Sequence, residues 1–436
     1  MSCKTIRSVK EVAESRKFTS IPSNFAFSQD EDAPLPDTDA PEIPTIDFSL
    51  LVNGTPDQRS QTIRRLGQAS MEWGFFMVVN HSVEESLREK MFEVCKDFFD
   101  LPEAEKREHV GEHVLGPIRY GTSFNPSVEK IHYWRDSLKI LVHPTFHSPE
   151  KPIDFRDVSH KFCIKIRELV KEVLGGISES LGLDGCYLEK ASELNAGLQM
   201  IVANFYPPCP QPEKAMGMPP HTDHGLLAIL MENNVGGLQV KYNGKWVLVN
   251  PHPNSFLVNV GDQLEILTNG KYKSVEHRAV VNNQRTRISV AIANGPSLGK
   301  AVSPVPLLVD SEHPEAYLAM TYEDYIKSQQ SKPLDGRSCL DRALIMSCKM
   351  IRSVKEVAES SNFISIPSNY AFSQDEDAPL PDTDAPEIPT IDFSLLVNGT
   401  PDQRSQTIRR LGQASMEWGF FMVNTTTESS SFPSHC

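Results

Sequence analysis

The chain has 436 residues, with 57 acidic and 43 basic side chains and a formal net charge of -14 at pH 7. A partner with a phosphate backbone requires a basic stripe, so this balance argues against nucleic-acid binding. Hydrophobic residues make up 39% and charged residues 23%, ordinary values for a globular protein, and the length allows one large unit or two to three domains.

Neither a signal peptide nor a membrane span is visible. The first twenty residues mix charged and isolated apolar positions, and no stretch approaches the roughly 18 apolar residues of a spanning helix. The eight cysteines are scattered and form no C-x-x-C pair, which favours free thiols in a reducing compartment. We therefore expect a cytoplasmic protein with no membrane partner, and a monomer.

The first half of the chain is rich in expected helices. Residues 43–51 predict a short strand, and 57–73 an amphipathic helix whose apolar positions include Met71. The run Phe75-Phe-Met-Val-Val79 predicts a buried strand between Gly74 and Asn80. Two further helices are expected at 85–99 and 159–183.

From about residue 197 the pattern changes to short apolar or alternating runs separated by Pro, Gly and Asn. Residues 238–242 and 245–249 form the clearest hairpin, because Asn243-Gly244 tolerates the positive φ angles of a type I′ turn. Other expected elements are strands at 255–260, 274–282 and 287–293 and a helix within 306–330. This spacing predicts an α+β fold in which flanking helices surround a jelly-roll core, a double-stranded β-helix.

A long internal repeat interrupts this organisation. Residues 346–423 copy residues 1–78 at a constant offset of 345, with differences at only five of the 78 positions. Solenoid repeats keep a packing pattern while their surfaces diverge, so two near-identical partial copies do not make a solenoid. We interpret the second copy as a partial tandem duplicate, with a regulatory copy that competes for the docking site of the first as the alternative.

A candidate metal site comes from three residues. His221 and Asp223 are two positions apart, so on an extended strand both side chains would project from one face. His277 lies on a later expected strand that a barrel can bring beside them. Two imidazoles and one carboxylate form the facial triad of non-haem iron(II) oxygenases. The bare triplet is a weak signal, because most histidines are surface or core residues.

A candidate anion site follows ten residues after His277, where Arg287 and Ser289 share one face of an expected strand. The planar guanidinium of arginine suits a carboxylate. On a surface strand Arg287 would be an ordinary charge. Inside a barrel it would be costly unless an anion met it, so a co-substrate carboxylate is a sensible partner.

Six motifs occur in a fixed order along the chain. They are Asn204-Phe-Tyr206-Pro-Pro-Cys-Pro, Pro220-His-Thr-Asp223, Val235-Gly-Gly-Leu-Gln-Val240, Gly261-Asp262, His277-Arg-Ala-Val and Arg287-Ile-Ser289. In this order they closely resemble the plant soluble 2-oxoglutarate-dependent dioxygenases, which include flavonoid, gibberellin and salicylate oxygenases. The resemblance covers about residues 43–344 and leaves the second copy unexplained.

The resemblance implies iron(II) bound by His221, Asp223 and His277, with O2 as oxidant, 2-oxoglutarate as co-substrate and ascorbate as reductant. The residues implied to hold 2-oxoglutarate are Arg287, Ser289, Tyr206 and Asn204. Hydroxylation of a small phenylpropanoid, flavonoid, salicylate-like or terpenoid metabolite, with release of succinate and carbon dioxide, is the implied reaction. The alternatives are a related oxidase that uses another reductant and a non-catalytic metabolite-binding protein on the same fold.

Other residues near these motifs have two interpretations. Tyr120, Phe124, Trp134 and Lys139 lie in the region that lines the substrate mouth of the resembling family. Equally, the aromatic residues would fill a core, and Lys139 would be a solvated surface charge. His224 would point away from the metal on a strand, which favours a structural role.

The domain organisation expected from these features has seven parts. They are an N-terminal extension at 1–42, an N-terminal dioxygenase region at 43–160, a helical connection at 161–196, the iron and 2-oxoglutarate core at 197–300, a C-terminal helical segment at 301–345, the duplicate at 346–423 and a disordered tail at 424–436.

Overall fold

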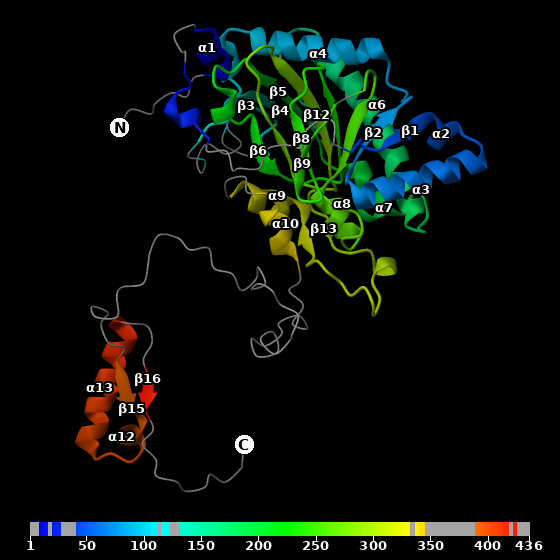
Figure 1. The fold of residues 1–436 in the computed structure, drawn as a ribbon. Coiled ribbons are helices and arrows are strands. Elements are labelled where there is room, and N and C mark those ends of the chain that lie inside the picture. Colours follow the sequence, from blue (N-terminus) through cyan, green and yellow to red (C-terminus); the bar gives the residue numbers. More distant parts are fainter. Residues whose placement is uncertain are drawn as a thin grey trace. The chain divides into compact units, whose positions relative to one another are not determined.

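A computed structural model describes most of the chain. The described residues are 8–15, 20–27, 41–111, 115–122, 129, 131–250, 252–331, 336–344, 389–417 and 422–424. Contacts divide the chain into two compact units, Met1–Ile351 and Arg352–Cys436. The first unit contains an eight-stranded, a four-stranded and a two-stranded sheet, with helices around them (Figure 1). Apart from Asn424, the expected disordered tail lies outside the described residues.

The larger sheet of the first unit has eight strands. In spatial order they are β1 (Thr45–Asp47), β2 (Phe75–Val79), β10 (Phe256–Val260), β7 (Leu227–Glu232), β12 (Arg287–Asn294), β5 (Gln199–Tyr206), β4 (Asp136–His143) and β3 (Ile118–Gly121). Only β1 and β2 pair in parallel. The other neighbours are antiparallel, as in the expected jelly roll.

Alternation along the central strands separates a helix-covered face from a second face. On β5, Ile201, Ala203 and Phe205 belong to the main hydrophobic core. Met200 and Val202, which alternate with them along the strand, do not. Successive side chains of a strand point to opposite faces, so this pattern buries one face under helices and turns the other toward the second sheet.

Five helices from the first half of the chain contribute buried side chains to this core. They are α2 (Phe48–Asn53), α3 (Pro56–Glu72), α4 (Glu85–Asp100), α6 (Phe155–Ser180) and α7 (Tyr187–Ala191). Two short helices, α1 (Val9–Glu14) and α5 (Glu103–Arg107), come from the same half, and Val9 and Val12 of α1 belong to a smaller cluster with Trp134. Thr55 and Gln58 form a capping box at the start of α3, with Pro56 in its first turn. In Figure 1, α4 and α6 lie side by side along the sheet, and their residues are in contact.

The smaller sheet completes the core. It contains β6 (Met218–His221), β11 (His277–Ala279), β8 (Leu238–Tyr242) and β9 (Lys245–Leu248), in that order. The predicted hairpin is confirmed, because Tyr242 pairs with Lys245 and both turn residues, Asn243 and Gly244, have positive φ of 48° and 77°. After this sheet come α8 (Asp262–Leu267), β13 (Ala301–Val302), β14 (Met320–Thr321), α9 (Tyr322–Gln330) and α10 (Ser338–Ala343).

Three expectations about these elements are wrong in detail. The strand expected at 43–51 ends at Asp47, whose carboxylate accepts from the backbone N–H of Ser49 and Leu50 and so starts α2. Met71 is 48% exposed, because it lies on the outer side of α3. The strand expected at 274–282 is only three residues long, since its register shifts beyond His277.

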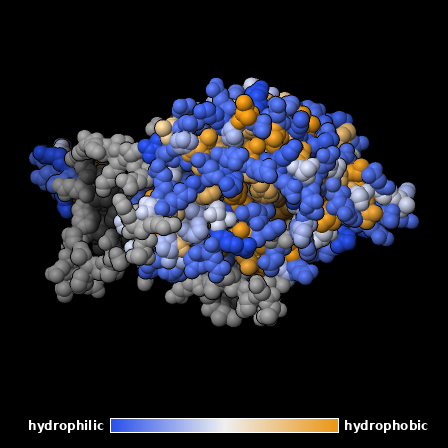
Figure 2. Space-filling view, turned by 90° about the horizontal axis from the view of Figure 1, so that it is seen from above, coloured by the Kyte–Doolittle hydropathy of each residue, from blue (hydrophilic) through white to orange (hydrophobic). Residues whose placement is uncertain are grey.

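The coloured part of the face seen in Figure 2 is mostly hydrophilic, with hydrophobic residues in small patches. Such patches are normal for a globular protein. Among the helices in the described part of the chain, none is long and apolar enough to cross a bilayer.

The second unit repeats the local structure of the first copy. Its elements are β15 (Thr390–Asp392), α12 (Phe393–Val397), α13 (Pro401–Glu417) and β16 (Met422–Asn424). The parallel register is the same in both copies, with Thr390 opposite Met422 and Thr45 opposite Met77. In the first unit β2 also pairs with β10, whereas in the described part of the second unit β16 pairs with β15 alone.

Identical sequence in different surroundings provides an internal comparison. Met77 is 2% exposed, whereas its copy Met422 is 58% exposed. We expect Met77→Ala to lower the free energy of unfolding of the first unit by about 2–5 kcal/mol. Met422→Ala should change the free energy of unfolding of the second unit by less than about 0.5 kcal/mol. Urea denaturation of both variants measures the difference, and equal effects would contradict this assignment of burial.

Candidate active site

Three side chains from two sheet segments converge on one point. The ligand atoms of His221, Asp223 and His277 all lie within 4.8 Å of one another. His221 ends β6, His277 begins β11, and the two residues are paired directly across these strands. Asp223 lies just beyond the end of β6, so the expectation that it shares a strand face with His221 is wrong. A turn, rather than a strand, brings its carboxylate to the histidines.

Both imidazoles have the orientation of metal ligands. His221 Nδ1 lies 2.9 Å from the carbonyl oxygen of Pro219, and His277 Nδ1 lies 3.2 Å from that of Val275. Because a carbonyl only accepts, each Nδ1 carries the proton and each Nε2 lone pair is available to a metal. Burial and the neighbouring His277 lower the pKa of His221 to about 3, so it is the neutral ligand form at pH 7.

The carboxylate of Asp223 is held in place by Asn259 from β10. The Asn259 amide donates to Asp223 Oδ2 at 2.9 Å, while Oδ1 lies 3.8 Å from Nε2 of both His221 and His277. Burial raises the pKa of Asp223, but the two histidines and the Asn259 hydrogen bond outweigh it and the net pKa is lowered. One carboxylate oxygen is thus turned toward the histidines and is ionised.

The turn that carries Asp223 packs against the start of α8. A side chain at Gly261 would come within 2.3 Å of the carbonyl oxygen of Gly225, so this close approach requires glycine. The Asp262 N–H donates to the carbonyl oxygen of Asp223 at 2.8 Å, and Thr222 donates to the Asp262 carboxylate at 3.2 Å. Asp262 therefore supports the turn from behind and stands outside the metal-ligating group.

Arg287 meets a protein carboxylate that sequence reasoning missed. Its Nε and Nη2 donate to Oε2 of Glu232 at 2.9 and 2.7 Å, and both side chains are buried. The guanidinium also lies over the ring of Tyr206, 4.9 Å from its centroid. Glu232 thus neutralises the guanidinium of Arg287 from the side of Nε and Nη2. Among the described residues, no hydrogen bond engages Nη1.

Ser289 and Asn204 lie opposite each other on β12 and β5. The Asn204 amide is 3.4 Å from Ser289 Oγ, and its carbonyl oxygen accepts from Arg135 Nη1 at 2.6 Å. Asn204 is therefore tied to Ser289 on one side and to Arg135 on the other. These contacts orient the serine hydroxyl beside Arg287, which is two residues away on the same strand.

One cavity joins the metal-ligating group to the Arg287 group. Its walls come from both sheets, and the metal-ligating group and the Arg287 group lie in the same space. The predicted site residues that line it are Asn204, Tyr206, His221, Asp223, His277, Arg287 and Ser289. Apolar walls are supplied by Phe75, Met200, Val202, Leu230, Leu238, Ala291 and Ala293, among others.

The residues expected at a substrate mouth behave differently from one another. Tyr120 and Trp134 are buried in hydrophobic clusters and are not among the cavity-lining residues, so the core interpretation holds for both. Phe124 lies outside the described residues. Lys139 lines the cavity, so its interpretation as a solvated surface charge is wrong. His224 also lines the cavity, where its Nδ1 lies 2.7 Å from the hydroxyl of Tyr322.

Comparison with known proteins gives this arrangement a family. Residues 197–296 match the family model of the 2OG-Fe(II) oxygenase superfamily, and residues 43–159 match the N-terminal model of non-haem dioxygenases in morphine synthesis. The chain is 44% identical over 305 residues to 2-oxoglutarate-dependent dioxygenase 19 of Oryza sativa subsp. japonica, covering 70% of this chain and 90% of that relative. The chain belongs to the 2OG-Fe(II) oxygenase superfamily.

Other relatives and solved structures agree with this assignment. Flavanone 3-dioxygenase 2 of the same rice is 40% identical over 69% of this chain and 86% of its own length. The crystal structure of JOX2 with 2OG, Fe and JA superposes with a TM-score of 0.67 at 30% identity, covering 78% of this chain and 98% of JOX2. That of the rice dioxygenase for auxin oxidation gives 0.60 at 27%, covering 70% and 100%.

The family assignment settles the reaction class and the fold. The protein is an oxidoreductase of the 2-oxoglutarate-dependent dioxygenase type, which uses Fe(II), 2-oxoglutarate and O2 on a small molecule. Its core is the double-stranded β-helix of these oxygenases, as the alternating strands predicted.

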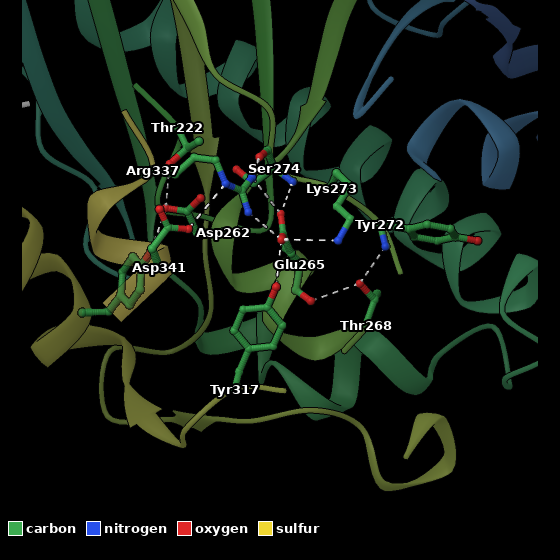
Figure 3. Close-up of polar contacts among 11 residues, drawn as sticks. Thr222, Asp262, Glu265, Thr268, Tyr272, Lys273, Ser274, Tyr317, Arg337 and Asp341 are labelled. Atoms are coloured by element: carbon green, nitrogen blue, oxygen red, sulfur yellow. Dashed lines mark hydrogen bonds and ion pairs between the residues drawn. The ribbon is translucent and has the colours of Figure 1, made fainter. Parts of the chain in front are cut away.

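A buried polar network links α8 of the oxygenase to its C-terminal segment. Figure 3 shows Glu265 at the centre of this network, with the side chains of Tyr317 and Arg337 pointing toward it. Glu265 Oε1 accepts from Arg337 Nη2 at 2.7 Å and from the Tyr317 hydroxyl at 2.8 Å. Tyr325 of α9 donates to Asp262 at 2.8 Å, one turn earlier. The network fastens the last helices beneath the turn that carries Asp223.

Removing the charge at the centre of this network should destabilise the oxygenase unit. Glu265 is buried and accepts hydrogen bonds from a hydroxyl, a backbone N–H and a guanidinium. We therefore expect Glu265→Gln to lower the free energy of unfolding by about 1–3 kcal/mol. The matched control is Glu276→Gln, which loses a more exposed pair with Lys241 and should cost less than about 1 kcal/mol. Urea unfolding compares them, and an equal cost would refute a central role for Glu265.

Proposed function

We propose that this oxygenase hydroxylates a small plant metabolite and that its metal is held by His221, Asp223 and His277. The observation that carries this proposal is the convergence of two imidazoles and one carboxylate in a cavity that Arg287 also lines. This donor set fits Fe(II), because imidazole and carboxylate are its preferred protein ligands in open facial sites.

The co-substrate has a matching place in the same cavity. We assign the far carboxylate of 2-oxoglutarate to the Nη1 side of the Arg287 guanidinium, since Glu232 already accepts from Nε and Nη2. The Ser289 hydroxyl, oriented by Asn204, donates to the same carboxylate. The ring of Tyr206 packs against the face of the guanidinium. These residues bind and orient the co-substrate, while Asn259 keeps Asp223 aimed at the metal.

When bound, Fe(II) supplies the oxidative chemistry with O2, coupled to the decarboxylation of 2-oxoglutarate to succinate. The protein contributes position and the exclusion of water. Apolar residues such as Phe75, Leu230 and Leu238 surround the polar groups of the cavity, and a dry site strengthens every charged contact within it. Phe75 further packs edge-on against the His277 ring, 5.3 Å between centroids, which holds the ring in place.

The wider setting of the reaction is also a proposal. One relative is named flavanone 3-dioxygenase 2, and JOX2 was crystallised in complex with JA. We place the substrate of this protein among small organic molecules of the same range. We further propose a cytoplasmic monomer that uses ascorbate to keep iron reduced and does not bind nucleic acid, in line with its net charge of -14.

The test is succinate release by the full-length protein supplied with Fe(II), 2-oxoglutarate, ascorbate and O2. A panel of phenolic and terpenoid compounds should include members that stimulate succinate release, and hydroxylated product should form in equal amount. The same assay with His221→Ala gives the background. A folded protein that binds Fe(II) but releases no succinate with any compound would overturn the proposal in favour of an oxidase with another reductant or a binding protein.

A further inference from the structure

The two residues ahead of α10, Gly336 and Arg337, lie against the edge of the smaller sheet. The strand β6, which ends at His221, is an outer strand of this sheet. Gly336 forms a parallel bridge with His221, and its N–H donates to the carbonyl oxygen of Pro220 at 3.2 Å. An outer strand leaves backbone groups unpaired on its free side. Gly336 therefore holds β6 at its end, next to a proposed metal ligand.

Gly336 also reaches the strand that carries His277. Its φ is +48°, and a Cβ atom added there would come within 2.3 Å of Oε1 of Glu276, the residue directly before His277. The other oxygen of this carboxylate is paired with Lys241 at 2.8 Å. Only glycine allows this approach without moving the Glu276 carboxylate.

Arg337 joins the approach to His277 to the helix α8. Its Nη2 donates to Glu265 Oε1 at 2.7 Å, and its Nη1 donates to the carbonyl oxygen of Ser274. In Figure 3 the Arg337 side chain points toward both residues. Ser274 is three residues before His277, and its N–H donates to Glu265 Oε2 at 2.5 Å. Arg337 and Glu265 thus hold both backbone groups of Ser274 and fix the approach to His277.

The helix α8 carries this restraint to the turn of Asp223. Glu265 lies in the same short helix as Asp262, whose N–H donates to the carbonyl oxygen of Asp223 at 2.8 Å. The N–H of Gln263, the next residue, donates to the carbonyl oxygen of Gly225 at 2.9 Å. Because backbone hydrogen bonds tie the residues of a helix together, a displacement of Glu265 shifts both of these contacts.

Buried groups anchor the segment that carries Arg337. Leu340 and Ala343 of α10 are buried and belong to the main hydrophobic core. Glu265 is buried as well, and the Tyr317 hydroxyl donates to it at 2.8 Å. A charged hydrogen bond to a carboxylate is strong and has a defined geometry. Arg337 is thus a fixed support for the elements that it contacts.

We propose that Arg337 is a positioning residue of the metal centre. With Gly336 it connects the two strands and the turn that carry the three proposed ligands, and so fixes the spacing of those ligands. Its own hydrogen bonds in the described part of the chain go to Glu265 and Ser274 and to none of the ligands. This inference rests on the proposed function, because it presupposes the metal site. A site performs only where the surrounding residues hold its ligands in the correct geometry.

Titration of the full-length, metal-free protein with Mn(II) tests this role. Arg337→Met removes the hydrogen bonds but keeps most of the apolar stem, and we expect Mn(II) affinity to fall by about 10-fold, the lower end of the range for groups that orient a metal ligand. Arg59→Met is the matched control. Arg59 makes two hydrogen bonds to Glu179 and is 38% exposed, against 27% for Arg337, but it lies on α3. Its substitution should leave Mn(II) affinity unchanged.

A second readout separates positioning from a general loss of stability. The visible absorption of Co(II) depends on its coordination geometry, so the spectrum of the Co(II)-loaded protein should change in Arg337→Met and stay the same in Arg59→Met. Urea unfolding shows which variants are folded. Wild-type Mn(II) affinity in folded Arg337→Met, an unchanged Co(II) spectrum in that variant, or an equal loss of affinity in Arg59→Met would overturn the proposal.

A pair of glycine variants decides the question if Arg337→Met does not fold. Gly336→Ala pushes against Glu276 and should also lower Mn(II) affinity. Gly182→Ala introduces the same kind of positive-φ strain, at φ of +77°, where nothing lies within 4 Å of the added Cβ. It should bind Mn(II) like the wild type. Equal affinities of the two alanine variants would contradict the positioning role.

His221→Ala separates this inference from the proposed function. The expected result is loss of Mn(II) binding in His221→Ala and weaker binding in Arg337→Met and Gly336→Ala. If His221→Ala binds Mn(II) as tightly as the wild type, the proposed metal site fails and the positioning role fails with it. If His221→Ala loses binding while the other two variants retain wild-type affinity, only the positioning role is overturned.

Discussion

Replacing Asp223 by alanine is expected to abolish substrate-stimulated succinate release and to weaken metal binding by at least about 100-fold, the upper range for loss of a group that merely supports a ligand. Asp223 is the one carboxylate among the three converging side chains, and its ionised Oδ1 is equidistant from both histidines. Two neutral imidazoles alone leave the charge of the cation without a counter-ion. Titration with Mn(II) measures binding, and the succinate assay measures turnover.

Two further variants show whether the effect belongs to the site. Asn259→Ala removes the hydrogen bond to Asp223 Oδ2 and should weaken metal binding by about 10- to 100-fold. Asp310→Ala removes an exposed carboxylate whose hydrogen bonds, among the described residues, stay within its own loop, and it should leave metal binding unchanged. Normal metal affinity in folded Asp223→Ala protein would exclude Asp223 as a ligand.

Opposite changes in co-substrate affinity are expected at Arg287 and Glu232. Arg287→Ala should raise the KM for 2-oxoglutarate by about 30- to 150-fold, corresponding to about 2–3 kcal/mol for charge-assisted hydrogen bonds. Glu232→Gln should lower that KM, because glutamine can still accept from the guanidinium but no longer neutralises it. Steady-state kinetics at varied 2-oxoglutarate separates KM from kcat.

Folding must be controlled at this buried pair, since Arg287→Ala leaves Glu232 without its partner. Arg287→Lys keeps a positive charge but loses the planar fork, so it should fold and still raise the KM. Glu232→Gln should lower the Tm without co-substrate and increase the stabilisation by 2-oxoglutarate. An unchanged KM in both Arg287→Lys and Glu232→Gln would rule out the assignment of the co-substrate carboxylate to Arg287.

The sequence by itself determined the fold class, the family and the residues that converge in the cavity. The Phe75–Val79 strand and the Asn243-Gly244 hairpin occur as predicted, because a β-branched and aromatic run and a positive-φ turn are local properties of the chain. His221 and Asp223 were recognised from their spacing and motif. Their proximity does not depend on the strand geometry that first suggested it, since β6 ends at His221.

Only the tertiary structure decided which groups surround these residues. Glu232 is 55 residues from Arg287, and Asn259 is 36 residues from Asp223, so no local pattern pairs either residue with the group that it contacts. The single polar position in the apolar strand Phe256–Val260 was the one available signal, for Asn259.

The duplicated segment shows directly that local sequence does not determine burial. Both copies form the same strand and helix pairing, because the local sequence specifies it. Met77 is buried in a cluster with Leu238 and Val240 of β8, whereas the described part of the second unit offers no such strand to cover Met422. Local sequence fixes hydrogen-bonding and periodicity, whereas burial and charge balance depend on partners that distant parts of the chain supply.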